Sequence, residues 1–218
     1  LEASEGDVEW QDGKYNVRGS PDQTKSFAEV ALMANLAWNM PPGVEPGLEA
    51  TAFFDPTNFV YPFGSHICTV EVDAETGEVK ILRYIAVDDC GPHINPMIVE
   101  GQIHGGVIQG IGEGLQEICI YDDSGQLITG TMMDYAVPRA SQMPRIETDH
   151  TVTPSPVNPL GIKGCGEAGT IASAACLVNA VCDALAPLGI EHLQKPLTPA
   201  RVWAAMQAAG QSGKEVGV

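Results

Sequence analysis

The glycine turn GCGEAGT, Gly164 to Thr170, constrains the fold most strongly, because prolines precede it and an apolar helical run follows it. Its G-x-G-x-x-G spacing is that of a dinucleotide-binding turn, which requires a buried parallel strand directly before it. The preceding segment, TPSPVNPLGIK, holds three prolines within six residues, and proline is not tolerated in a central strand. Asp183, the acidic residue at a suitable distance, falls inside the following helix. The pattern therefore argues against a nucleotide turn, and the lack of G-K-[ST] excludes a P-loop.

Length and charge limit the classes of partner. The 218 residues suffice for one large domain or two small ones. With 28 acidic and 11 basic residues, the net charge of −17 repels nucleic acids and anionic membranes. We find no run of about 18 apolar residues, so we expect no membrane span. Because Leu1 to Val8 resembles the interior of a longer polypeptide, we expect a fragment or a processed subunit.

The cysteines and histidines show no metal-ligand spacing. Six cysteines lie mostly in apolar runs without a C-x-x-C pair, which is typical of reduced, buried thiols in a cytoplasmic protein. Their even number leaves disulfides open. The five histidines form no H-x-x-x-H or H-E-x-x-H pattern, which argues against a zinc site. We therefore expect no metal-ligating side chains.

Local signals predict an α+β fold, with hairpins and separate packed helices rather than regular βαβ alternation. Asp12-Gly13 is a strong hairpin signal, and Ser26 with Glu29 forms a capping box that opens a helix reaching Asn39. Clean alternation after residue 66 predicts a second hairpin with one buried face. The expected elements are hairpins over 8–17, 66–90 and 118–131, a long loop to about 61, irregular chain to 159, and helices over 26–39, 98–116, 172–186 and 199–209.

The predicted helix over 98–116 contains six glycines. Each costs roughly 1 kcal/mol relative to alanine in a helix interior, so something should require the close backbone approach that glycine permits. Two explanations remain open, namely tight packing against a neighbouring helix and the approach of a large flat cofactor.

Glu167 lies where the glycine turn feeds a helix N-terminus. Free backbone N–H groups and the positive end of the helix dipole favour an ionised carboxylate there. From these residues alone, the favoured explanation is that Glu167 stabilises the helix dipole. Lys163, four residues earlier, is a candidate charge partner or a contact for an anionic ligand.

Two long stretches carry a family resemblance: VDDCGPHINPMIVEGQIHGGVIQGIGEGLQE (87–117) and TPSPVNPLGIKGCGEAGTIASAACLVNAVCDAL (153–185). They closely resemble the C-terminal part of the large, molybdenum-binding subunit of the xanthine oxidase family, nearest to the aerobic carbon monoxide dehydrogenase-like molybdenum hydroxylases. The resemblance spans about Glu49 to Ala205. It implies that residues 1–218 form the second, C-terminal molybdopterin-binding domain of a larger chain, as a fragment or a split subunit.

The resemblance also implies residue roles. Glu167 matches the catalytic base, which takes a proton from a hydroxyl or water on molybdenum and makes it nucleophilic toward an electron-poor carbon. Gln109 matches the glutamine that hydrogen-bonds the pterin, and His104 and Gly105 lie beside it as further cofactor contacts. Lys163 matches a lysine that serves site structure or cofactor contact. The turn Gly164, Cys165 and Gly166 brings backbone close to the cofactor, with Cys165 as a small turn residue rather than a metal ligand.

The same resemblance implies a molybdopterin-dependent oxidoreductase that acts only within a complex. The cofactor is molybdenum–molybdopterin cytosine dinucleotide, shared with the N-terminal portion of the large subunit. A 2Fe-2S subunit and an FAD (flavin) subunit receive the electrons, in a cytoplasmic dimer of heteromers that oxidises a small aldehyde, N-heteroaromatic compound or CO with water as the oxygen source. The competing hypothesis is a non-catalytic scaffold that keeps the fold without cofactor.

Overall fold

The computed structural model describes residues 1–37 and 40–215, with side chains described as far as residue 210. The chain forms two compact units, Leu1–Asp55 and Pro56–Val218. The assignment of residues 1–218 to one domain stays a prediction.

The first unit is an antiparallel three-stranded sheet followed by a helix. Strands β1 (Val8–Gln11) and β2 (Lys14–Val17) form the predicted hairpin, in which Asp12 and Gly13 both have positive φ, 49° and 75°, as a type I′ turn requires. Strand β3 (Ser20–Ser26) also pairs with β2, and its polar sequence gave no strand signal.

Helix α1 (Phe27–Leu36) begins at the predicted capping box. The Ser26 hydroxyl accepts from the Glu29 N–H, and the Glu29 carboxylate accepts from the Ser26 N–H. The helix ends at Leu36, followed by Ala37 in the left-handed conformation. The predicted helix end, Asn39, lies outside the described residues.

The second unit is built on the three-stranded sheet β4 (Phe63–Val72), β5 (Val79–Asp89) and β6 (Ile146–His150). The antiparallel β4–β5 pair is the predicted hairpin. Cys68, Val70 and Val72 lie on its buried side, as their alternation indicates. Strand β6 pairs with β5 in parallel, within a segment expected to be irregular.

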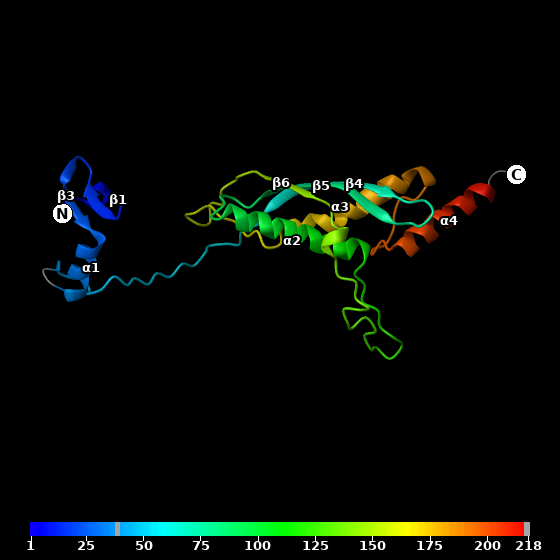
Figure 1. Cartoon of the computed structure of the whole chain (residues 1–218), viewed down its shortest axis with the longest axis horizontal. Coiled ribbons are helices and arrows are strands. Elements are labelled where there is room, and N and C mark those ends of the chain that lie inside the picture. The colour runs from blue at the N-terminus through cyan, green and yellow to red at the C-terminus, as the bar shows by residue number, and fades with distance from the viewer. Residues whose placement is uncertain (38–39, 216–218) are drawn as a thin grey trace. The chain divides into compact units, whose positions relative to one another are not determined.

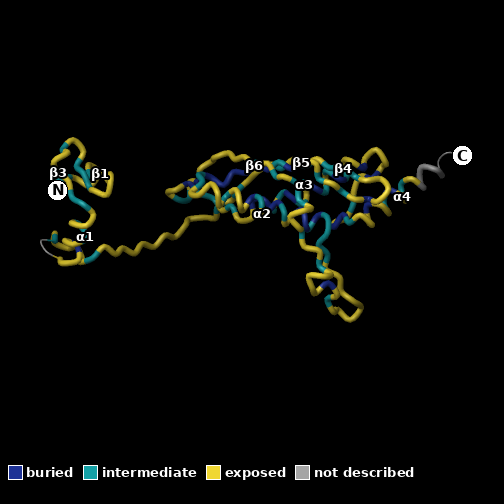
Figure 2. The backbone as a smooth tube through the Cα atoms, in the orientation of Figure 1, coloured by how far each residue is buried: buried dark blue, intermediate teal, exposed yellow. Residues whose placement is uncertain are grey.

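Helices α2 (Pro96–Leu115) and α3 (Ala168–Leu185) pack against each other, and α3 also covers β4 and β5 (Figure 1). Helix α4 (Pro199–Glu215) begins at the predicted Pro199. Buried residues line the facing sides of the sheet and helices (Figure 2). The largest fully buried apolar side chains are those of Tyr84, Val107, Ile111, Leu177, Val181, Leu197 and Val202. The mixed architecture confirms the α+β prediction.

The glycines of α2 explain how closely the two helices approach. A Cβ on Gly106 would lie 2.8 Å from the Thr170 backbone nitrogen, and one on Gly110 would overlap the Ser173 hydroxyl. In the other direction, a Cβ on Gly169 would lie 2.3 Å from the Ile103 carbonyl oxygen. These glycines therefore serve helix packing. A Cβ on Gly105 would meet nothing within 4 Å.

Two expectations are corrected. The hairpin predicted over 118–131 is reduced to a turn with the bridge Tyr121↔Leu127, formed by backbone bonds from the Ile128 N–H to the Ile120 carbonyl and from the Asp122 N–H to the Gln126 carbonyl. The run Ala168–Leu188 is long and apolar enough to cross a membrane by length and composition, although we expected no such run. Its many alanines make it apolar, and Leu177, Val181 and Leu185 are buried on one side of it, although only 22% of the span is buried.

Candidate functional site

Glu167 is the N-cap residue of α3. Its backbone carbonyl accepts hydrogen bonds from the N–H groups of Thr170 and Ile171. Its side chain makes no capping bond and is exposed. The Glu167 carboxylate therefore makes no capping bond and is open to solvent at the N-terminal end of α3.

Thr170, one turn into α3, links this helix to α2. Its hydroxyl donates to the Gly106 carbonyl at 2.9 Å and to Oε1 of Gln109 at 3.1 Å. Gln109 is otherwise exposed. The helix crossing thus brings Glu167 and Gln109, which are far apart in sequence, to neighbouring positions.

The surroundings of this crossing have room for a ligand. Gly105, Gly164 and Gly166 are exposed, and a Cβ on any of them would meet nothing within 4 Å. Gln102 precedes Gln109 by seven residues, about two turns, and so shares its helical face; it was not predicted as a site residue. His104 Nε2 is buried without a hydrogen-bond partner among the described residues. The exposed amide and the open backbone fit a polar, planar cofactor, whereas His104 lies on another side of α2 than Gln109.

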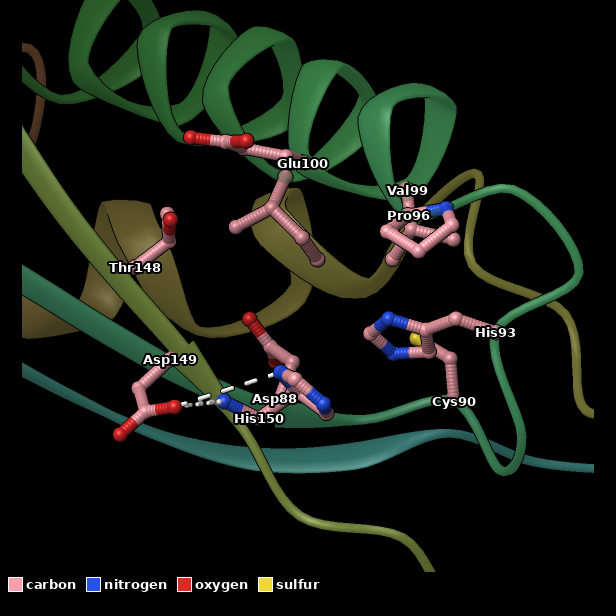
Figure 3. Close-up of a pocket in the computed structure, with 10 residues that line it drawn as sticks. Asp88, Cys90, His93, Pro96, Val99, Glu100, Thr148, Asp149 and His150 are labelled. Carbon is pink, nitrogen blue, oxygen red and sulfur yellow. Dashed lines mark hydrogen bonds and ion pairs between the residues drawn. The ribbon is translucent and has the colours of Figure 1, made fainter.

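A cleft of about 230 Å³ lies between β5, the start of α2, and β6 (Figure 3). The rings of His93 and His150 lie 4.3 Å apart there, and burial, followed by the charge of His150, lowers the pKa of His93. Asp88 also lines the cleft. It lies 3.3 Å from Nε2 of His66, whose Nδ1 lies 3.0 Å from the Tyr84 hydroxyl. Among the described residues, no cluster of three or more His, Cys, Asp or Glu side chains has the arrangement of a metal site.

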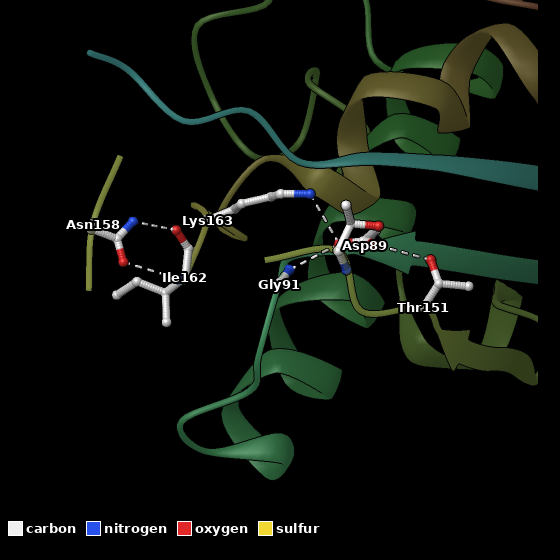
Figure 4. A network of polar contacts seen from close by, with 7 residues as sticks. Asp89, Gly91, Thr151, Asn158, Ile162 and Lys163 are labelled. Atoms are coloured by element: carbon white, nitrogen blue, oxygen red, sulfur yellow. Dashed lines mark hydrogen bonds and ion pairs between the residues drawn. The ribbon is translucent and has the colours of Figure 1, made fainter. Parts of the chain in front are cut away.

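Asp89, at the end of β5, organises the loop that leads to Glu167 (Figure 4). Its carboxylate accepts from the Gly91 N–H at 3.0 Å, the Thr151 hydroxyl at 3.0 Å and the Thr153 N–H at 3.1 Å. The Lys163 ammonium donates to Oδ1 at 3.1 Å. Burial alone would raise the pKa of Asp89, but the bonds from Gly91, Thr153 and Lys163 outweigh it and hold this pKa well below its ordinary range.

Lys163 is held on three sides. Its ammonium binds Asp89, lies 4.5 Å from the centre of the Phe63 ring, and is nearly buried. Its backbone N–H donates to the Cys90 carbonyl. Just before it, the Asn158 side chain forms two hydrogen bonds with the backbone of Ile162: its NH₂ group donates to the Ile162 carbonyl, and its oxygen accepts from the Ile162 N–H. Lys163 therefore stabilises the loop that precedes Glu167. Its contact with the cofactor stays a prediction.

Cys165 lies in the turn as a half-buried free thiol packed against the hydrophobic core. All six cysteines fall within the described ranges and are free. Burial raises the pKa of the Cys90 thiol to about 11. The sequence reasoning missed Asp89 and Thr170, because neither lies in a spacing pattern that indicates its long-range partner.

Residues 1–144 match the model of the molybdopterin cofactor-binding domain. The chain belongs to this family. It is 45% identical over 208 residues to the carbon monoxide dehydrogenase large chain of Hydrogenophaga pseudoflava, covering 95% of this chain and 26% of the relative. It is 43% identical over 205 residues to the nicotine 6-hydroxylase large subunit of Paenarthrobacter nicotinovorans, covering 93% and 25%.

Solved structures give the same result for the fold of this molybdopterin cofactor-binding domain. The crystal structure of Cu,Mo-CO dehydrogenase matches with a TM-score of 0.86 at 41% identity, over 96% of this chain and 26% of that one. Quinoline 2-oxidoreductase from Pseudomonas putida 86 matches with a TM-score of 0.85 at 47% identity, over 94% and 26%. The predicted resemblance to a xanthine oxidase family large subunit is confirmed. The chain spans about a quarter of the length of the relatives it matches.

Proposed function

We propose that this chain is the part of a molybdenum hydroxylase that holds one side of the molybdenum–molybdopterin cofactor and supplies the catalytic base. One observation carries the proposal. Thr170 connects the N-terminal turn of α3, which begins at Glu167, to Gln109 on α2, beside glycines that leave space for a ligand. The exposed carboxylate and the exposed amide therefore flank one open surface.

Each residue has a separate task. The bound cofactor would supply an electrophilic metal centre and the acceptor of two electrons. Glu167, at the N-terminus of α3, would accept the proton of the water-derived nucleophile. Gln109 offers its amide to the pterin edge. Asp89 and Lys163 hold the turn that precedes Glu167.

The matched relatives support the substrate class and the assembly we propose. They include a carbon monoxide dehydrogenase, a nicotine hydroxylase and a quinoline oxidoreductase. We infer oxidation of CO, an aldehyde or an N-heteroaromatic carbon, with a cytosine dinucleotide form of the cofactor. The rest of the large subunit completes the site, and 2Fe-2S and FAD subunits carry the electrons, in a cytoplasmic dimer of heteromers.

The test begins with the metal and pterin content of the complete, purified complex. An intact complex that lacks both would establish the scaffold alternative instead. In a loaded complex, Glu167→Gln should retain cofactor and lose at least about a hundredfold in turnover, the contribution typical of a general base. Substantial remaining turnover would remove Glu167 from the role of base. Asp183→Asn, on an exposed site of the same helix, is the matched control and should leave turnover unchanged.

A further inference from the structure

Thr170 is not among the residues predicted for the site, yet its hydroxyl is the link between the two helices that carry them. The oxygen lies 2.9 Å from the Gly106 carbonyl and 3.1 Å from Oε1 of Gln109. A hydroxyl has one proton, so the two acceptors share it in a three-centre bond. Both acceptors belong to α2, whereas Thr170 belongs to the first turn of α3.

The structure places Oε1 of Gln109, rather than its NH₂ group, against the Thr170 hydroxyl. An amide side chain can present either its oxygen or its NH₂ group to a ligand, and the two ends have the same shape. Because Oε1 is held by Thr170, the NH₂ group remains as the free donor on the exposed face. Gln109 is exposed, so its long side chain would otherwise sample several rotamers, at an entropic cost on binding.

The surrounding backbone makes Thr170 a firm anchor. Gly106 and Gly169 let α2 and α3 touch through their backbones at this level, and the Thr170 N–H donates to the Glu167 carbonyl. The hydroxyl is therefore tied to the same turn as the proposed base. Neither helix can shift along the other without breaking the bond to Gly106 or the bond to Gln109.

We propose that Thr170 is a positioning residue of the cofactor site, which holds Gln109 with its NH₂ group directed at the cofactor and keeps Glu167 in register with it. The inference rests on the proposed function, because it assigns Gln109 a bound cofactor. Beyond that function, it adds Thr170 to the site and gives a direction for the Gln109 amide. It also makes the position of α2 depend on that of α3.

A double-mutant cycle in the complete molybdenum complex tests it, with the rate at which molybdenum and pterin are lost from the protein as the readout. Thr170→Val removes the hydroxyl at nearly constant volume and should raise this rate about three- to tenfold, as expected for one hydrogen bond. Gln109→Ala should raise it at least as much. The double variant should match Gln109→Ala, because Thr170 acts through Gln109. Additive effects, or no effect of Thr170→Val, would overturn the inference.

Three further variants test the hydroxyl of Thr170, the direction of the Gln109 amide and the specificity of the effect. Thr170→Ser keeps the hydroxyl and should restore cofactor retention. Gln109→Glu keeps an oxygen for Thr170 but loses the NH₂ donor, so it should lose cofactor as Gln109→Ala does; normal retention would show that the amide direction is wrong. Ser173→Ala, one turn further along the same interface, removes a hydroxyl that donates to the Thr170 carbonyl; it leaves both bonds of the Thr170 hydroxyl in place and should leave retention unchanged.

The two proposals fail in different ways. If the wild-type complex contains neither molybdenum nor pterin, the proposed function fails. If it is loaded and active but the cycle shows no coupling, only the role of Thr170 fails. Should Thr170→Val not assemble, Thr170→Ala takes its place in the cycle, because it removes the same hydroxyl without branched bulk.

Discussion

The Lys163 ammonium lies 3.1 Å from Oδ1 of Asp89, and the two side chains are only 8% and 0% exposed. This ion pair joins the end of β5 to the loop that leads into α3, 74 residues further along the chain. Asp89 also receives donors from the chain that follows β6. Three segments that are distant in sequence therefore meet at the Asp89 carboxylate, and one of them carries Lys163, four residues before the proposed base.

We predict that Asp89→Asn lowers the free energy of unfolding by about 3–5 kcal/mol, because it leaves the buried Lys163 charge without its partner. This change is measured from the denaturant midpoint of the complete protein, followed with a signal that reports loss of tertiary structure. The exposed pair Arg83–Glu147, at 59% and 45% exposure, is the control, and Glu147→Gln should lower the midpoint far less, because solvent screens an exposed ion pair. Similar losses in both variants would show that burial does not strengthen the Asp89 contact.

The same pair predicts a loss of stability in acid. The folded-state pKa of Asp89 is lowered, so its contribution is complete above the unfolded value of about 4 and is lost as the pH falls from there through the folded pKa. Asp89→Asn has no such titration. The stability difference between wild type and this variant should therefore narrow between about pH 5 and pH 2, as measured by denaturant midpoints at each pH. A constant difference over that range would contradict the assignment.

The sequence predicted those parts of the fold that depend on near neighbours. The Asp12–Gly13 turn, the Ser26–Glu29 capping box and the alternation along β4 each involve contacts within a few residues. Strands β3 and β6 were missed. Their polar or proline-flanked sequences carry no strand periodicity, and their pairing depends on partner strands supplied by tertiary structure.

The candidate site shows the same limit. A family resemblance indicated Glu167 and Gln109, but it gave no contact between their helices. Thr170 and Gln109 are 61 residues apart, and Asp89 and Thr153 are 64 apart. Thr170 and Asp89 lie within the quoted motifs, but the local pattern of those motifs gives no signal for partners so far away in sequence. The α2 glycines were recognised as unusual, and only the helix crossing separates those used for packing from the open Gly105.

The last prediction compares two adjacent glycines on α2, Gly106, which packs against α3, and Gly105, which is open. Gly106→Ala places a methyl group 2.8 Å from the Thr170 backbone nitrogen, so the helices must separate, and overpacking of this kind costs about 1–3 kcal/mol. Gly105→Ala meets no atom within 4 Å, and alanine favours a helix by up to about 1 kcal/mol over glycine. In protein prepared without molybdenum, Gly106→Ala should therefore lower the denaturant midpoint, and Gly105→Ala should leave it unchanged or raise it. In the loaded complex, Gly105→Ala should nevertheless speed the loss of molybdenum and pterin, because its methyl group occupies the space proposed for the cofactor. Unchanged cofactor retention in Gly105→Ala would show that the cofactor does not approach the helix at this residue.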